Sequence, residues 1–302
     1  MCSWITSQNG DLSLFQLKMS IDQKIHGIST LIRTTCSECQ SQGTGFFYQE
    51  LAPKDTDKND GWRAIKNTWL VTNRHVIIQI HNGKELIPDS VTFHMRRIVN
   101  NQPVWDPIEL QRNILVERAL FHPDKSIDVC IIDIYGLLKE KLNDGNQYMA
   151  WFAVSKENLP GENKIHPEVT SDAIVIGYPR GFYDQHNIFP IVKSGIVASK
   201  WGAFFDQKPY FLIDAKLFPG SSGSIVISKP TNLLVENGNL FHNTEKQFAF
   251  LGVYSGEPYQ QHHPIEFEDI AIIRKSGFNV GIVWYGHLVE DIPHSTMKCN
   301  TG

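Results

Sequence analysis

The segment Phe218-Pro219-Gly220-Ser221-Ser222-Gly223-Ser224 leads directly into the apolar run Ile225-Val226-Ile227. Glycines on both sides of Ser222 allow a tight turn whose backbone N–H groups converge on one point, which is what the stabilisation of an oxyanion requires. The apolar run that follows is typical of a buried strand. Turns rich in Gly and Ser also occur as ordinary hairpin loops, so Ser222 is a candidate nucleophile that needs partners elsewhere in the chain.

Two segments upstream supply candidate partners. In Trp69-Leu70-Val71-Thr72-Asn73-Arg74-His75-Val76, a buried-type strand ends in a polar turn that carries His75, and a histidine there can act as a base. In Ser126-Ile127-Asp128-Val129-Cys130-Ile131-Ile132-Asp133, the carboxylate of Asp128 directly precedes an apolar run. A buried carboxylate needs a partner, and an imidazole N–H is one. The alternatives are that Asp128 only caps a turn, or that Asp133 at the far end of the strand is the carboxylate partner.

Most of the chain consists of short segments rich in Val, Ile, Phe and Tyr, separated by Gly, Pro, Asn or Asp. This pattern is typical of an all-β barrel or sandwich. The predicted strands are residues 28–33, 44–49, 68–72, 90–95, 129–134, 173–176, 188–194, 210–213, 224–228 and 248–255. The helix candidates are the first 25 residues, 136–142 and 287–292. The polar stretches 53–61 and 228–247 are predicted to be surface hairpin insertions.

The composition fits a globular protein, since 41% of the 302 residues are hydrophobic and 22 are glycine. Lys and Arg number 28 against 32 Asp and Glu, and the formal charge of −4 without a long basic run argues against nucleic-acid binding. No apolar run approaches the roughly 18 residues of a membrane-spanning helix, so we expect no membrane association. The N-terminus lacks the pattern of a signal peptide. Five irregularly spaced cysteines favour a reducing compartment, so we expect a cytoplasmic protein.

The order His75, Asp128, Ser222 in an all-β chain matches one of the known orders of a catalytic triad. The chain resembles the trypsin-like serine proteases of the chymotrypsin fold, and among them the HtrA-type protease domain without a PDZ domain. The resemblance covers about residues 25 to 292, and the matching segments are residues 43–46, 72–76, 127–129, 176–181, 194–197, 219–223, 251–253 and 279–283.

This resemblance implies two packed six-stranded antiparallel β-barrels followed by a short C-terminal helix, with the active site in the crevice between the barrels. His75 and Asp128 would come from the first barrel and Ser222 from the second. The expected organisation is an N-terminal extension at 1–24, a first barrel at 25–140, a connection at 141–166, a second barrel at 167–285, and a C-terminal helix and tail at 286–302.

The resemblance also implies the chemistry of a serine endopeptidase, with Ser222 as nucleophile, His75 as general base and Asp128 orienting the imidazole. The backbone of Gly220, Ser221 and Ser222 would supply the oxyanion hole. The substrate would be a protein or peptide, and the chemistry needs no cofactor. The alternative is a non-catalytic double-barrel module that binds peptides or a partner protein.

Other expectations follow from the resemblance and from departures from it. Ser221 stands where secreted digestive relatives have the aspartate that receives a newly cut N-terminus, so the oxyanion loop must be ordered in another way, and an activating partner is one candidate. Lys216 lies where the family places the base of the primary specificity pocket, although a surface lysine is the alternative. The segment Tyr254-Ser255-Gly256 matches the strand that pairs with substrate, and Ser255 could support Asp128 by a hydrogen bond.

Two further segments resemble metal sites only weakly. Cys36 and Cys39 are spaced like a metal-binding or redox pair, but zinc needs about four ligands and no second pair occurs, so a polar hairpin turn is the better interpretation. Residues 55–61 resemble a calcium loop, yet the glycine comes one residue late and Lys66 stands where the glutamate ligand belongs. We therefore expect no bound metal.

Overall fold

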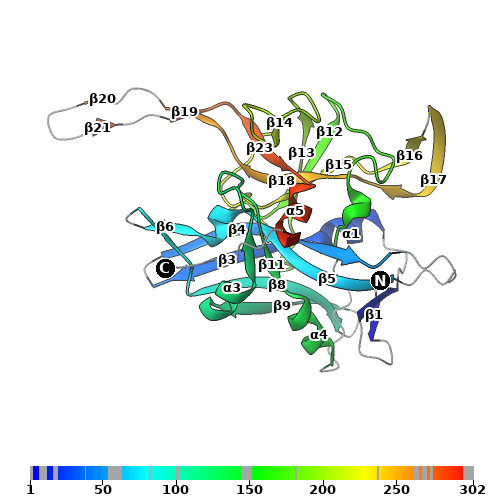
Figure 1. Cartoon of the computed structure of the whole chain (residues 1–302), viewed down its shortest axis with the longest axis horizontal. Coiled ribbons are helices and arrows are strands. Elements are labelled where there is room, and N and C mark those ends of the chain that lie inside the picture. Colours follow the sequence, from blue (N-terminus) through cyan, green and yellow to red (C-terminus); the bar gives the residue numbers. More distant parts are fainter. Residues whose placement is uncertain are drawn as a thin grey trace.

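The computed structural model confirms a mainly β chain with few and short helices (Figure 1). It describes residues 3–6, 12–15, 20–37, 39–53, 63–81, 83–99, 102–143, 152–180, 182–236, 238–261, 265–266, 271–272 and 275–294. The described residues form two units, and in Figure 1 the second lies above the first.

The first unit is built on a nine-stranded sheet. Its main path runs β1-β2-β5-β4-β3-β8-β9, and β11 pairs with both β5 and β10. The ladder is interrupted between β9 and β10, where α3 joins the two strands and buries Leu115. The elements of this unit are β1 (Ser3–Thr6), β2 (Leu12–Phe15), α1 (Ile21–Ile28), β3 (Ser29–Cys36), β4 (Cys39–Leu51), β5 (Arg63–Thr72), α2 (Arg74–Ile77), β6 (Gln79–His81), β7 (Lys84–Leu86), β8 (Ser90–Val99), β9 (Gln102–Gln111), α3 (Arg112–Arg118), β10 (Ala119–Phe121), β11 (Cys130–Asp133) and α4 (Tyr135–Asn143).

The second unit is a closed six-stranded barrel in the order β12-β13-β14-β23-β18-β15, as expected. Two hairpins extend from it, β16–β17 and the long arm that carries β19 to β22 (Figure 1). The elements are the 3₁₀ turn η1 (Lys156–Asn158), β12 (Asp172–Gly177), β13 (Ile191–Val197), β14 (Tyr210–Asp214), β15 (Ile225–Ser228), β16 (Thr231–Glu236), β17 (Asn239–Gln247), β18 (Phe250–Gly256), β19 (Tyr259–Gln261), β20 (Ile265–Glu266), β21 (Ala271–Ile272), β22 (Lys275–Gly277), β23 (Val280–Tyr285) and α5 (Leu288–His294).

The larger of two clusters of buried apolar side chains is shared by the two units. One cluster of buried side chains lies within the first unit, whereas the larger cluster runs from β4 and β5 of the first unit into the barrel strands of the second. Helix α5 follows the last barrel strand and packs against β10 and β11 of the first unit. Because burial of apolar surface is the main favourable term in folding, this shared core fixes the relative position of the two units.

The structure corrects the expectation of a helix over the first 25 residues. Helix α1 begins only at Ile21, and β1 and β2 precede it as a strand pair. The helix starts there because Ser20 and Gln23 form a capping box, in which each side chain bonds the backbone N–H of the other residue. The helices expected at 136–142 and 287–292 correspond to α4 and α5.

Of the two predicted hairpin insertions, the one at 228–247 is confirmed as the β16–β17 pair. The one at 53–61 lies, apart from Pro53, outside the described residues, as does the stretch 144–151 of the predicted connection. None of the helices in the described part of the chain is long and apolar enough to cross a membrane.

Candidate active site

His75 lies on α2, a single helical turn that directly follows strand β5. The side chains of Val76 and Ile77 on the same turn are buried and anchor it, while that of His75 is 51% exposed. Asn73, which begins the turn, is buried, and its Nδ2 donates to the backbone carbonyl of Asp128 over 2.6 Å. Asn73 had no predicted role, and its position between a buried strand and His75 is the signal that could have identified it.

The carboxylate of Asp128 is the partner of His75. Oδ1 accepts the backbone N–H of His75 at 3.0 Å, and Oδ2 contacts Nδ1 of the ring at 2.6 Å. Because a carboxylate only accepts, Nδ1 must carry the ring proton, which leaves the lone pair of Nε2 free to act as a base. Asp133, the competing candidate, instead accepts the backbone N–H of Tyr135 at 2.9 Å.

Ser222 lies in the turn between β14 and β15 and meets the same site through Ser255. Its Oγ donates to the backbone carbonyl of Ser255 over 2.9 Å. The hydroxyl of Ser255 donates to Oδ2 of Asp128 over 2.6 Å, so the hydrogen bond expected between these two residues is present. Ser255 thus links the predicted nucleophile to the predicted carboxylate, while the Ser222 proton is directed at a carbonyl rather than at His75.

The loop before Ser222 forms a turn in which two N–H groups have no partner in the described part of the chain. The N–H of Ser221 donates to the carbonyl of Phe218 over 3.1 Å, and Pro219 and Gly220 occupy the central positions. Gly220 has φ of 91°, which together with Pro219 is the pattern of a type II turn. Because the N–H of Ser221 is already bonded, the predicted oxyanion hole reduces to Gly220 and Ser222, whose N–H groups have no partner among the described residues.

Of the residues predicted to bind substrate, Tyr254 and Ser255 contact the segment around Ser222. Both backbone groups of Tyr254 are bonded next to Ser222. Its carbonyl accepts the N–H of Gly223 at 2.8 Å, and its N–H donates to the carbonyl of Ser224 over 2.9 Å. Burial raises the pKa of Tyr254 above its ordinary value. Gly256 borders open space. Lys216 is exposed, and it is the backbone carbonyl of Lys216 that accepts a hydrogen bond from the ammonium of Lys193.

The weakly predicted metal sites give no cluster in the described part of the chain. No group of three or more His, Cys, Asp or Glu residues is placed there to hold an ion. Cys36 and Cys39 face each other in the β3–β4 register, and the thiol of Cys36 donates to Gln79 over 3.1 Å. Residues 55–61 lie outside the described residues.

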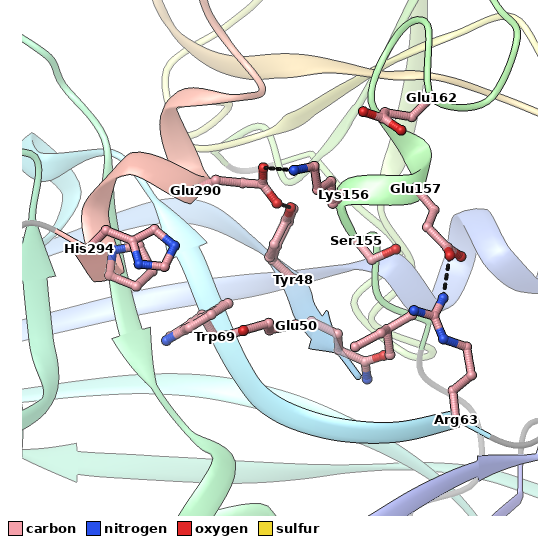
Figure 2. A pocket seen from close by; sticks show the side chains of 13 residues that line it. Tyr48, Glu50, Arg63, Trp69, Ser155, Lys156, Glu157, Glu162, Glu290 and His294 are labelled. Atoms are coloured by element: carbon pink, nitrogen blue, oxygen red, sulfur yellow. Dashed lines mark hydrogen bonds and ion pairs between the residues drawn. The ribbon is translucent and has the colours of Figure 1, made fainter. Parts of the chain in front are cut away.

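A hollow of about 410 Å³ lies where β4, β5, residues 155–162 and α5 meet, and neither His75, Asp128 nor Ser222 lines it (Figure 2). Figure 2 shows that several of its charged groups are paired with one another, among them Glu290 with Lys156. The Tyr48 hydroxyl donates to Glu290 over 2.8 Å. The guanidinium of Arg63 is paired with Glu157. The bond between Tyr48 and Glu290 therefore joins α5 to β4 of the first unit.

The sequence matches the trypsin-like peptidase domain over residues 43–235, which is more than half of the chain. A comparison with curated proteins finds no match. Among solved structures, the active form of the Rv3671c protease of M. tuberculosis is 15% identical with a TM-score of 0.42, and the match covers 95% of this chain and 93% of that one. The tobacco etch virus protease complexed with product is 9% identical with a TM-score of 0.42, covering 81% and 73%.

An inactivated protease paralogue of the scabies mite is 13% identical with a TM-score of 0.40, and the match covers 87% of this chain and 94% of that one. All three are similar to this chain at low identity, so the assignment depends on the domain match. That match spans the segments that carry His75, Asp128 and Ser222. The chain belongs to the trypsin-like peptidase family.

Proposed function

We propose that the chain is a serine endopeptidase that uses His75, Asp128 and Ser222 to cleave peptide bonds through an acyl-enzyme. The contacts of Ser255 support the proposal, because its hydroxyl donates to Asp128 and its carbonyl accepts the hydroxyl of Ser222. The family implies peptide or protein substrates. We expect a restricted set of protein substrates.

In the proposed reaction, the Ser222 hydroxyl first turns from the carbonyl of Ser255 to Nε2 of His75. Catalytic hydrogen bonds commonly tighten in this way only when substrate binds. Ser222 Oγ attacks the carbonyl carbon of the peptide bond while Nε2 takes the hydroxyl proton. The N–H groups of Gly220 and Ser222 hold the charge that develops on the carbonyl oxygen. The C–N bond then breaks as Nε2 passes the proton to the leaving amine, and an ester on Ser222 remains.

Water completes the cycle by hydrolysing this ester. His75 takes a proton from the water as its oxygen attacks, and the same proton returns to Ser222 Oγ when the acid product leaves. Asp128 stays ionised throughout, holds Nδ1–H and stabilises the charged imidazole. Since His75 carries the transferred proton in each step, we propose that the reaction needs no cofactor.

The activating partner predicted from the sequence stays a prediction. It depends on Ser221, which cannot form the salt bridge that orders the loop in digestive relatives. Hydrolysis of a peptide library should be compared with and without candidate activators, and equal rates throughout would contradict a need for a partner.

Labelling with a fluorophosphonate probe tests the proposed function, because the probe reacts with activated serine nucleophiles. We expect the folded chain to be labelled at Ser222, and Ser222→Ala to abolish labelling. Ser221→Ala is the matched control, since it removes the neighbouring hydroxyl without touching the nucleophile, and it should still be labelled. A folded native chain that fails to react would instead support the non-catalytic binding module.

A further inference from the structure

The peptide bond between Pro219 and Gly220 can face either way, and only one orientation serves the proposed function. Type I and type II turns differ by a rotation of roughly half a turn of this central peptide, while both keep the hydrogen bond between Ser221 and Phe218. In the type II turn of this structure, the N–H of Gly220 bonds to none of the residues that the structure describes. In a type I turn, the carbonyl of Pro219 would take its place and repel an oxyanion.

Two contacts hold the turn, one on this peptide and one on the peptide that follows it. The carbonyl of Pro219 accepts the backbone N–H of Arg180 at 2.7 Å. The next carbonyl, that of Gly220, accepts the hydroxyl of Thr44 at 3.0 Å. The carbonyl and the N–H of one peptide point in opposite directions, so tying the Pro219 carbonyl to Arg180 directs the Gly220 N–H away from it.

Thr44 is itself fixed on several sides. It is fully buried on β4 of the first unit. Its hydroxyl oxygen accepts the backbone N–H of Tyr178 at 2.9 Å while its proton goes to Gly220. Its own N–H donates to the carbonyl of Ser222 over 2.8 Å, and its carbonyl accepts the hydroxyl of Thr72 at 2.7 Å. One side chain of the first unit thus joins two loops of the second, the one after β12 and the one that carries the nucleophile.

We propose that Thr44 is a positioning residue of the oxyanion hole. Its hydroxyl connects the N–H of Tyr178 to the carbonyl of Gly220 and so keeps the N–H of Gly220 facing the substrate. The proposal rests on the proposed function of Ser222. Without the hydroxyl, one buried N–H and one buried carbonyl lose their partner, and the turn can recover a partner for the carbonyl only by moving.

The test compares Thr44→Val, which keeps the branched shape but removes the hydroxyl, with Thr44→Ser, which keeps the hydroxyl. Thr30→Val is the matched control. Thr30 is also fully buried, and its hydroxyl likewise joins a backbone N–H to a backbone carbonyl, but both belong to His94. The readouts are the maximal labelling rate and the half-saturating concentration of a fluorophosphonate probe, and hydrogen exchange over residues 218–224 by mass spectrometry.

We expect Thr44→Val to lower the maximal labelling rate at least tenfold with little change in half-saturating concentration, because misplacing one oxyanion donor affects the chemical step. Exchange at 218–224 should become faster. Thr44→Ser should stay within about threefold of the native rate, and so should Thr30→Val even though it loses comparable stability. If Thr44→Val does not fold, Thr44→Ala replaces it.

The two readouts separate the two proposals. If the native chain is not labelled but exchange at 218–224 rises in Thr44→Val and not in Thr30→Val, the proposed function fails, and Thr44 orders the turn at 218–224 without serving an oxyanion hole. If the native chain is labelled and Thr44→Val reacts at the native rate, the positioning role is overturned. An equal loss of rate in Thr44→Val and Thr30→Val also overturns it, because a general loss of packing would then be the cause.

Discussion

Replacing Asp128 with asparagine keeps the size of the side chain but exchanges one acceptor oxygen for an NH₂ donor. In the native site, the backbone N–H of His75 reaches Oδ1, while Nδ1 of His75 and the hydroxyl of Ser255 reach Oδ2. The backbone N–H is a fixed donor, so the asparagine oxygen should take the Oδ1 position. The NH₂ group then faces Nδ1, which must accept, and the ring proton moves to Nε2.

The size of the effect follows from this change of tautomer. An imidazole protonated at Nε2 cannot take the proton of Ser222, so the loss is confined to the chemical step. In proteases with a Ser-His-Asp triad, the same exchange lowers kcat about 10⁴-fold, which corresponds to about 5 kcal/mol of transition-state stabilisation. Folding should change little, because the asparagine oxygen still accepts the backbone N–H and the Ser255 hydroxyl can turn to accept from the NH₂ group.

The assay is the rate of fluorophosphonate labelling at neutral pH, with urea unfolding as the measure of stability. Asp133→Asn is the matched control, because this carboxylate caps the N–H of Tyr135 and its loss should leave the rate within about threefold of native. A labelling rate of Asp128→Asn within tenfold of the native rate would refute the tautomer argument. A loss of rate that accompanies unfolding would refute the claim that the effect is chemical.

Three other substitutions test the stability of the fold. Gly223→Ala should destabilise the chain by more than about 2 kcal/mol in urea unfolding. The φ angle of Gly223 is 84°, and the added methyl would lie 2.0 Å from the carbonyl oxygen of Thr44. Gly136→Ala is the control and should cause no such loss, because a methyl at Gly136 would meet open space. Burial lowers the pKa of His94 below its ordinary 6.5. As the pH falls, this side chain is therefore protonated in the unfolded chain before it is protonated in the folded one. The free energy of unfolding should fall below about pH 6.5 by up to about 1.4 kcal/mol per pH unit. His94→Gln should flatten that slope, and an unchanged slope would contradict the assignment. Burial raises the pKa of Tyr48, so its hydroxyl stays neutral and donates to Glu290 on α5. Tyr48→Phe should therefore lower the free energy of unfolding in urea by about 1 kcal/mol. No loss would show that this hydrogen bond adds nothing to stability.

The three candidate catalytic side chains could be predicted from the sequence because each lies at the end of an apolar run. The apolar pattern alone does not distinguish Asp128 from Asp133, because both flank the same strand, and only the family resemblance favours Asp128. The choice is decided by pairing, since β11 lies antiparallel to β5 with Cys130 opposite Thr72. That register puts the residues before Cys130 beside those after Thr72, so Asp128 meets His75.

Other elements needed tertiary context. Helix α3 lies in no predicted element, because its three consecutive apolar residues, 114–116, give no helical period. It forms where the ladder between β9 and β10 is interrupted, and it buries Leu115 there. The role of Thr44 also could not be predicted, since its partners Tyr178 and Gly220 are 134 and 176 residues away along the chain.

The position of the site follows from the core that the two units share. Phe46 lies two residues after Thr44 on β4, and its ring packs edge to face against Phe250 with centroids 5.3 Å apart. Phe250 begins β18, the strand that carries Ser255. Burial of this aromatic pair therefore sets the spacing between β4 and β18. On β4, Thr44 contacts the loop that carries Ser222. On β18, Ser255 contacts the carboxylate of Asp128. Because such a core has few alternative packings, catalytic geometry and stability depend on the same contacts, and a substitution that separates the units should impair both.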